Sequence, residues 1–163
     1  MKLYHGSLVT VEKPLILPRK EGHTSDFGIG FYTTTDYKQA ERWVKIRKGI
    51  DTNQEGYVSE YDVPDDILSI TDLKILKFDS ASEAWLDFVI SNRRDKSFSH
   101  DYDLVYGPVA NDRVYTTISL YEDELLDKTE TLARLKTFVL TDQVLFHTDK
   151  ALQFLHFVRS VKI

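Results

Sequence analysis

The stretch that decides the fold lies near the N-terminus and reads Asp26-Phe27-Gly28-Ile29-Gly30-Phe31-Tyr32-Thr33-Thr34-Thr35. Ile29, Phe31 and Tyr32 have side chains that favour strands, and the glycines stand beside them. We therefore predict a strand over residues 28–34. The glycines also keep the backbone low beside a ligand on which the Tyr32 ring can stack, although a glycine-rich hairpin with a core tyrosine has the same pattern.

The residues that follow, 36–48, have the apolar pattern of a helix. Tyr37, Ala40 and Val44 fall on one stripe at helical spacing, and Thr35 can cap the first turn. A dinucleotide-binding fingerprint has a third glycine and places its glycines after the strand, whereas here they precede it. We therefore exclude a Rossmann site.

Outward from this segment, short strands and helices alternate along the chain. Strands are predicted at residues 3–5, 56–63, 103–106 and 144–146. Helices are predicted after a capping box at residues 80–83, over residues 127–136, and over residues 149–158 behind a Thr148 cap. Because the spacing is too irregular for repeated parallel βαβ units, we predict an α+β fold with a mixed, mainly antiparallel sheet and flanking helices. The length of 163 residues suits a single domain, 1–163.

The composition excludes several classes of protein. The formal net charge is -5, so a broad electrostatic surface for nucleic acid is not expected. The absence of cysteine excludes disulfide scaffolds, thiolate zinc sites and cysteine nucleophiles. The histidines lack metal-ligand spacing, and we predict no metal. No apolar run is long enough for a signal peptide or a membrane span, so we expect a cytoplasmic protein without a membrane partner.

Two further segments carry polar side chains next to predicted strands. His5-Gly6-Ser7 closes the first strand, where backbone groups can pair with a flat amide such as nicotinamide and His5 can bond a ribose hydroxyl. Gln143 stands at the mouth of the strand 144–146, poised to face a cleft. Taken alone, a histidine in a turn and a surface glutamine are the more ordinary interpretation of each segment.

The order and spacing of these three segments are similar to those of the ADP-ribosyltransferase superfamily, on the branch shared by diphtheria toxin and the poly-ADP-ribose polymerases. His5-Gly6-Ser7 matches the first motif of that branch, residues 27–32 match its Phe-Gly-x-Gly motif with the following tyrosine, and Gln143 stands at its third, usually acidic, position. More narrowly, the chain resembles a family of uncharacterised bacterial domains often found as toxins beside antitoxin partners. The resemblance implies a split sheet, NAD as co-substrate and a macromolecular acceptor of ADP-ribose.

The resemblance also implies a role for each matching residue. His5, Tyr32 and Gln143 form the catalytic set: the histidine holds a ribose hydroxyl, the tyrosine stacks on the nicotinamide ring, and the glutamine orients the ribose 2′-hydroxyl. Gly6 pairs with the nicotinamide amide through its backbone, and Ser7 assists it.

The remaining NAD-binding candidates lie around these motifs. Trp43 is expected to wall the other side of the nicotinamide, although a core position explains the tryptophan as well, and Gly30 is a further candidate. Arg19 can meet the pyrophosphate, and Asn111 and Arg113 can contact the ribose, a phosphate or the acceptor. A solvated turn explains these polar residues equally well.

The chemistry expected from this set is the transfer of a single ADP-ribose. A neutral amide at position 143 can orient a hydroxyl but cannot act as a base, so polymer formation is not expected and the acceptor must be reactive already or activated by another residue. The preferred interpretation is a mono-ADP-ribosyltransferase that acts as a toxin or effector on a protein or nucleic acid. An NAD glycohydrolase and a non-catalytic module that binds NAD, ADP-ribose or a protein partner stay open as alternatives.

Overall fold

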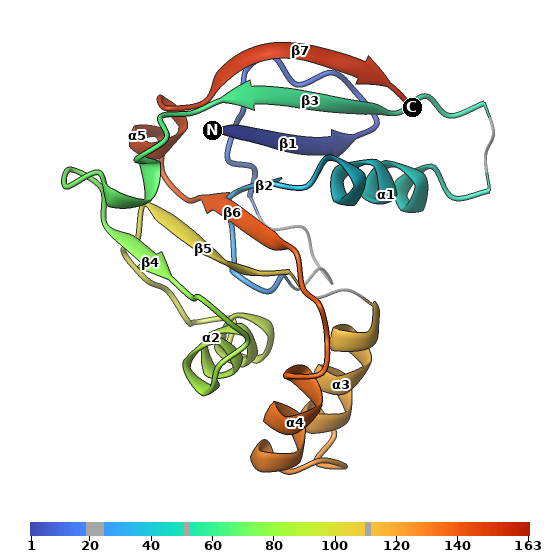
Figure 1. Cartoon of the computed structure of the whole chain (residues 1–163), viewed down its shortest axis with the longest axis vertical. Helices are drawn as coiled ribbons and strands as arrows, with labels where there is room; N and C mark the ends of the chain where they lie inside the picture. The colour runs from blue at the N-terminus through green and yellow to red at the C-terminus, as the bar shows by residue number, and fades with distance from the viewer. Residues whose placement is uncertain (19–24, 51–52, 110–111) are drawn as a thin grey trace.

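The computed structural model describes residues 1–18, 25–50, 53–109 and 112–163. In these residues one sheet has the strand order β4-β5-β6-β2-β1-β3-β7 (Figure 1). The strands are β1 (Lys2–Ser7), β2 (Phe31–Thr34), β3 (Tyr57–Asp62), β4 (Ile75–Lys77), β5 (Leu104–Pro108), β6 (Asp142–Phe146) and β7 (His156–Lys162). The helices are α1 (Tyr37–Lys48), η1 (Ile67–Ser69), α2 (Glu83–Arg94), α3 (Asp112–Glu122), α4 (Lys128–Leu135) and α5 (Asp149–Leu152).

The sheet is mixed and mainly antiparallel. β4 and β5 run parallel, and the other neighbouring strands run antiparallel. The predicted α+β class, with a mainly antiparallel sheet and flanking helices, is therefore confirmed. In Figure 1, β1, β3 and β7 lie together in the upper part, and β6, β5 and β4 run obliquely beneath them.

The two parts of the sheet meet at a narrow junction between β1 and β2. β1 pairs with β3 along its whole length, from Lys2 opposite Asp62 to Ser7 opposite Tyr57. With β2, in contrast, its register is given by one pair, Tyr4 opposite Thr34. The end of β1 that carries His5-Gly6-Ser7 thus lies beyond the paired position, where a site can open between the strands.

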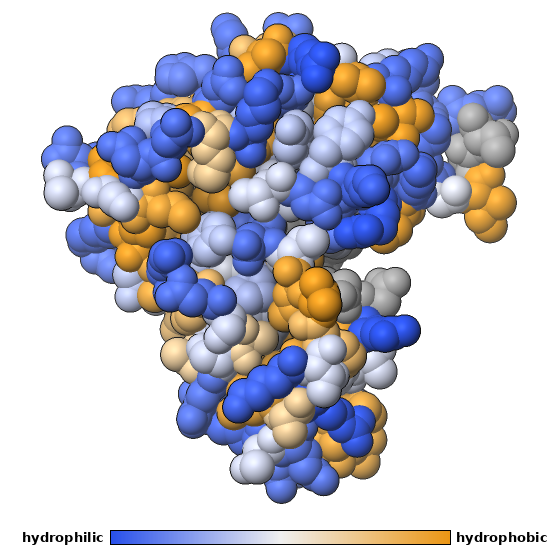
Figure 2. Space-filling view, in the orientation of Figure 1, coloured by the Kyte–Doolittle hydropathy of each residue, from blue (hydrophilic) through white to orange (hydrophobic). Residues whose placement is uncertain are grey.

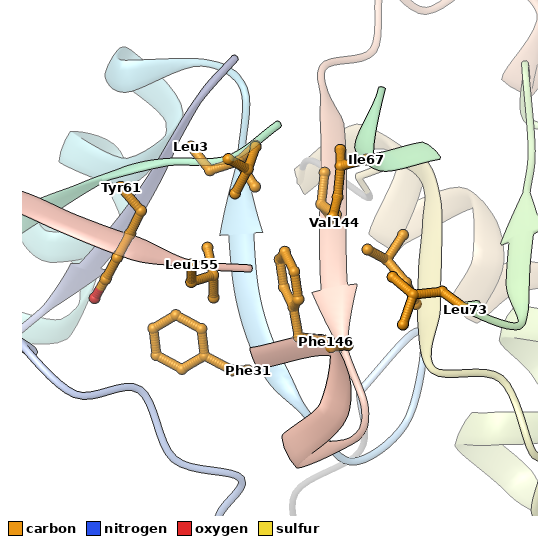
Figure 3. Close-up of a cluster of buried hydrophobic side chains, with 11 residues drawn as sticks. Leu3, Phe31, Tyr61, Ile67, Leu73, Val144, Phe146 and Leu155 are labelled. Carbon is orange, nitrogen blue, oxygen red and sulfur yellow. The ribbon is translucent and has the colours of Figure 1, made fainter. Parts of the chain in front are cut away.

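Apolar side chains cover both faces of the sheet because successive strand residues point to opposite sides. One face carries a cluster that includes Leu3, Phe31 and Phe146 (Figure 3). The other face carries Leu145, which packs among side chains from α2, α3 and α4, including Trp85. α1 covers the same face at its other end, where Ala40 and Val44 pack with Val58 of β3 and with the ring of Tyr4 of β1.

The predicted helix at residues 36–48 is confirmed, but its cap is not the predicted residue. Asp36 is the N-cap, and its carboxylate accepts a hydrogen bond from the Lys38 N–H at 2.8 Å. Thr35 is exposed and precedes the cap. A carboxylate bonds the free N–H groups of the first turn and is also favoured there by the helix dipole.

Removal of this cap gives the first testable prediction. Asp36→Ala is expected to lower the free energy of unfolding by about 1 kcal/mol, because the Lys38 N–H loses its acceptor. Thr35→Ala is the matched control and is expected to leave the stability unchanged. Urea denaturation of the two variants checks this. An equal loss of stability in Thr35→Ala and Asp36→Ala would contradict the assignment of Asp36 alone as the cap.

The other differences from the sequence prediction lie at helix boundaries and near the C-terminus. α2 begins after Ser82, whose hydroxyl accepts from the Trp85 N–H, so the predicted capping box at residues 80–83 is wrong. Thr148 caps α5 as predicted, but the helix ends at Leu152. The predicted helix over residues 149–158 is therefore wrong, because β7 begins at His156 and pairs with β3.

The face seen in Figure 2 is largely hydrophilic. Figure 2 shows hydrophilic residues over much of one face, with separate hydrophobic patches between them. None of the helices in the described residues combines the length and apolar character that a membrane crossing requires.

Candidate functional site

A cavity of about 730 Å³ opens at the β1–β2 junction. Its volume lies within the range of about 300–1,000 Å³ that is usual for small-molecule sites. Its walls come from β1, β2, the start of β6, α1, α3 and the segment 8–17. Of the predicted site residues, it brings together His5, Gly6, Ser7, Gly30, Tyr32, Trp43 and Gln143.

His5 links the two strands where their pairing ends. Its Nδ1 lies 2.7 Å from the Tyr32 carbonyl oxygen, and because a carbonyl can only accept, Nδ1 carries the proton. Burial, with a smaller contribution from the charge of Arg47, lowers the pKa of His5 to about 4. The imidazole is thus neutral near pH 7 and keeps a lone pair on Nε2. Its centre lies 4.5 Å from the centre of the Phe31 ring, with 31° between the two planes.

Tyr32 contributes an aromatic ring to the cavity wall. Its hydroxyl donates to the Gly28 carbonyl oxygen at 2.8 Å and accepts from the Phe27 N–H at 3.3 Å. Both partners belong to the glycine turn before β2, so the turn and the ring hold each other in place. This arrangement fixes the plane of the ring without a contact from any ligand.

Gln143 supplies a buried amide whose donor is unused. Gln143 is 4% exposed and lines the cavity from the start of strand β6, where it pairs with Thr34 of β2. The Nε2 atom has no hydrogen-bond partner among the described residues. Because an unpaired buried donor costs about 1–3 kcal/mol, this amide is placed to donate to an acceptor that enters the cavity.

Two predicted glycines are explained by packing rather than by ligand approach. A Cβ on Gly6 would lie 2.2 Å from the carbonyl oxygen of Ala40 in α1, and a Cβ on Gly30 would lie 2.6 Å from the Phe146 carbonyl oxygen. The expected reason for a glycine at position 6, close approach of a flat ligand, is therefore incomplete. The absence of a side chain first lets α1 approach β1, and α1 in turn forms a wall of the cavity.

Ser7 and Trp43 both line the cavity, but the Ser7 hydroxyl is already hydrogen-bonded within the protein whereas the Trp43 side chain is exposed. The Ser7 hydroxyl donates to the Val9 carbonyl oxygen, so its proton is used within its own turn. Trp43 lies on α1, is 41% exposed and lines the cavity. The competing interpretation of Trp43 as a core residue is wrong for that reason.

Three of the predicted NAD-binding residues are not brought to the cavity by the described structure. Arg113 is exposed on the first turn of α3 and is not part of the lining. Its predicted contact is therefore not supported, since α3 presents Tyr115 to the cavity instead. Arg19 and Asn111 lie outside the described residues.

Several lining residues were not predicted from the sequence. Asp26 and Tyr115 line one part of the cavity, and Arg47 and Lys13 supply positive charge to it. Asp26 belongs to the quoted motif, so its place beside the glycine turn was a usable signal. Tyr115 had no such signal, because its position depends on how α3 packs.

The buried histidines predict a pH dependence of stability. Burial lowers the pKa of both His5 and His147 to about 4. The unfolded chain takes up protons near pH 6.5, whereas the folded chain does so near pH 4, so the free energy of unfolding is expected to fall as the pH is lowered between these values. Urea midpoints at pH 7 and pH 5 check this, and an unchanged slope in His5→Gln or His147→Gln would contradict it.

The comparisons with known proteins place the chain in a family without assigning a reaction. A family model described as "Protein of unknown function (DUF3990)" matches residues 1–157. No curated protein and no solved structure matches the chain. Since the family match covers nearly the whole sequence, from the first strand to the start of the last, the chain belongs to the DUF3990 family.

Proposed function

We propose that the chain is an NAD-dependent mono-ADP-ribosyltransferase that releases nicotinamide and transfers ADP-ribose to a macromolecule. The observation that carries the proposal is that His5, Tyr32 and Gln143, from three different strands, line one cavity. Each of the three offers a different contact: an acceptor nitrogen, an aromatic face and an amide donor. These are the contacts that a pyridine carboxamide joined to a ribose can use.

The nicotinamide half fits the part of the cavity near Tyr32. The ring of Tyr32 and the indole of Trp43 supply aromatic surfaces on which a flat heteroaromatic ring can stack. The unused Nε2 donor of Gln143 can bond an oxygen of the carboxamide or of the ribose. Orientation of the leaving group and the sugar is the main contribution that these side chains make to the rate.

The ribose and the diphosphate fit the remaining polar groups. The lone pair on His5 Nε2 can accept from a ribose hydroxyl, because the Tyr32 carbonyl holds the proton on Nδ1. Arg47 and Lys13 line the cavity and can neutralise phosphate oxygens. In this proposal they take the role predicted for Arg19.

A macromolecular acceptor is favoured by the exposed apolar side chains at the cavity. Val9, Leu15, Leu17, Trp43 and Tyr115 line it and expose between 41% and 66% of their surface. Exposed apolar groups around a site are typical of surfaces that contact another macromolecule. For this reason we prefer transfer to a macromolecule over hydrolysis by water. A cytoplasmic site of action accords with the cysteine-free sequence.

The proposal is tested by incubating the purified chain with NAD labelled in its adenylate half and a cell lysate. Label is expected to appear on a macromolecule with the wild type and to be lost with Tyr32→Ala. Tyr57→Ala, which changes a tyrosine of β3 outside the cavity, is the matched control and is expected to keep the transfer. Free labelled ADP-ribose without labelled macromolecule would instead make the chain an NAD glycohydrolase, and label transfer by Tyr32→Ala would refute the site.

Gln143 yields a prediction in which stability and activity change in opposite directions. Gln143→Leu removes the unpaired donor at similar volume and is expected to raise the free energy of unfolding by about 1 kcal/mol while turnover falls on the order of 100-fold. Gln39→Leu is the control for stability, because the Gln39 amide oxygen accepts from Arg42 and its loss is destabilising. Urea denaturation and nicotinamide release measure the two effects. A less stable Gln143→Leu with full activity would contradict the role.

A further inference from the structure

Asp26 places a carboxylate in the cavity wall that the proposed roles of His5, Tyr32 and Gln143 leave unused. It lies in the segment before β2, lines the cavity and is 17% exposed at its side chain. Among the described residues that line the cavity, Asp26 is the one that carries a carboxylate. The neutral amide of Gln143 cannot accept a proton at neutral pH.

Asp26 is linked through the buried side chain of Arg93 to a second carboxylate, that of Glu122. The Nη1 atom of Arg93, on α2, lies 3.7 Å from the Asp26 Oδ1, and its Nη2 lies 3.1 Å from the Glu122 Oε2 on α3. The guanidinium also lies 4.4 Å from the centre of the Tyr115 ring, so Arg93 connects Asp26 to two residues of α3. The Arg93 side chain is only 6% exposed, and its position is therefore fixed by packing.

The contact between Arg93 and Asp26 is an ion pair rather than a hydrogen bond. At 3.7 Å the two atoms are beyond hydrogen-bonding distance, and Arg93 Nη1 is itself without a hydrogen-bond partner among the described residues. The Asp26 carboxylate is thus held near a positive charge, and the residue lines the cavity. Burial of a carboxylate with so little compensation is unfavourable for folding and is typical of a functional group.

We propose that the Asp26 carboxylate is the general base that accepts the proton of the incoming acceptor. This inference rests on the proposed function and supplies the base that Gln143 cannot. In the step, the bond between nicotinamide and the ribose carbon breaks, and its electron pair leaves with nicotinamide. The acceptor oxygen or nitrogen bonds to that carbon, and its proton passes to a carboxylate oxygen of Asp26.

The charges around Asp26 set the pH at which it can act. Burial raises the pKa of Asp26 to about 6, the charge of Glu122 adds to the rise, and the charge of Arg93 opposes it. The Nε atom of Arg94 lies 3.8 Å from the Glu122 Oε1 and offsets part of the charge of Glu122. Asp26 is therefore a carboxylate at pH 7 to 8 and accepts a proton as the pH falls below about 6.

The test compares nicotinamide release and ADP-ribose transfer by the wild type and Asp26→Asn between pH 5 and 8. The wild-type kcat is expected to decline below pH 6. Asp26→Asn is expected to lower kcat on the order of 100-fold, to leave the KM for NAD within about 3-fold, and to lose the acidic decline. Asp123→Asn removes a carboxylate from an exposed position of the neighbouring turn and is expected to behave as the wild type.

The outcomes separate this inference from the proposed function. A wild type that turns over NAD without an acidic decline, or an Asp26→Asn variant with the wild-type kcat, overturns the role of Asp26 and leaves the transferase intact. A wild type that does not turn over NAD overturns the transferase itself. Should Asp26→Asn fail to fold, Asp26→Glu keeps the carboxylate, and it supports the role if it retains the acidic decline and refutes it if the decline is absent.

Discussion

His5→Ala is expected to lower kcat/KM for nicotinamide release by about 100- to 1,000-fold, the usual effect of removing one polar contact to a developing charge. The substitution deletes both the Nε2 lone pair of a residue that lines the cavity and the Nδ1 proton donated to the Tyr32 carbonyl. Because β1 and β2 pair at Tyr4 and Thr34 and not at His5, the imidazole is also the link that holds this end of the two strands together.

A second substitution separates the two roles of His5. His5→Asn retains a side-chain N–H that can reach the Tyr32 carbonyl but has no acceptor in place of Nε2. We expect it to be as stable as the wild type and nearly as inactive as His5→Ala. Steady-state kinetics with thermal denaturation of the same samples makes the comparison, and an active His5→Asn would show that Nε2 makes no contact in the reaction.

Gly6→Ala is expected to destabilise the protein by about 3 kcal/mol or more, because overpacking against a rigid neighbour cannot relax. The added Cβ would lie 2.2 Å from the Ala40 carbonyl oxygen and 3.1 Å from a methyl group of Val44. The first of these atoms belongs to the backbone of α1, so the helix itself has to move. Since α1 carries Trp43 and Arg47 into the cavity wall, the loss of stability is expected to be accompanied by loss of NAD binding.

Urea denaturation of Gly6→Ala measures this effect, with Ser7→Ala at the next position as the control. Ser7→Ala removes one hydrogen bond to the Val9 carbonyl and is expected to cost about 1 kcal/mol. A Gly6→Ala variant as stable as the wild type would show that α1 does not depend on the glycine. The position would then be explained by ligand approach alone.

The parts of the fold that could be predicted are those that depend on local sequence. The stripe of Tyr37, Ala40 and Val44 identified α1 because helix periodicity is a local signal, and Ala40 and Val44 are indeed buried. β7 could not be recognised in this way. Ala151, Leu152 and Leu155 recur at helical spacing, whereas the strand that follows is determined by its pairing with the distant β3. Helix α3 was missed although Val114 and Ile118, both buried, stand four residues apart.

In the candidate site, too, the features that depend on local sequence could be predicted and those that depend on tertiary packing could not. His5 and Tyr32 lie within predicted strands and Gln143 directly precedes one, so their motifs could be found in the sequence, and the structure brings them to one cavity. The burial of Asp26 could not be foreseen, because it depends on Arg93 from α2 and on the packing of α3. A charged residue in a turn is usually solvated, and only tertiary packing distinguishes this one.

The most direct test of the cavity as an NAD site is the release of nicotinamide from NAD by the purified wild-type chain. A lysate supplies the acceptor, and chromatography measures the nicotinamide that is released. We predict release that saturates with NAD concentration and is inhibited by added nicotinamide. A folded chain that produces no nicotinamide above the uncatalysed background would contradict the account.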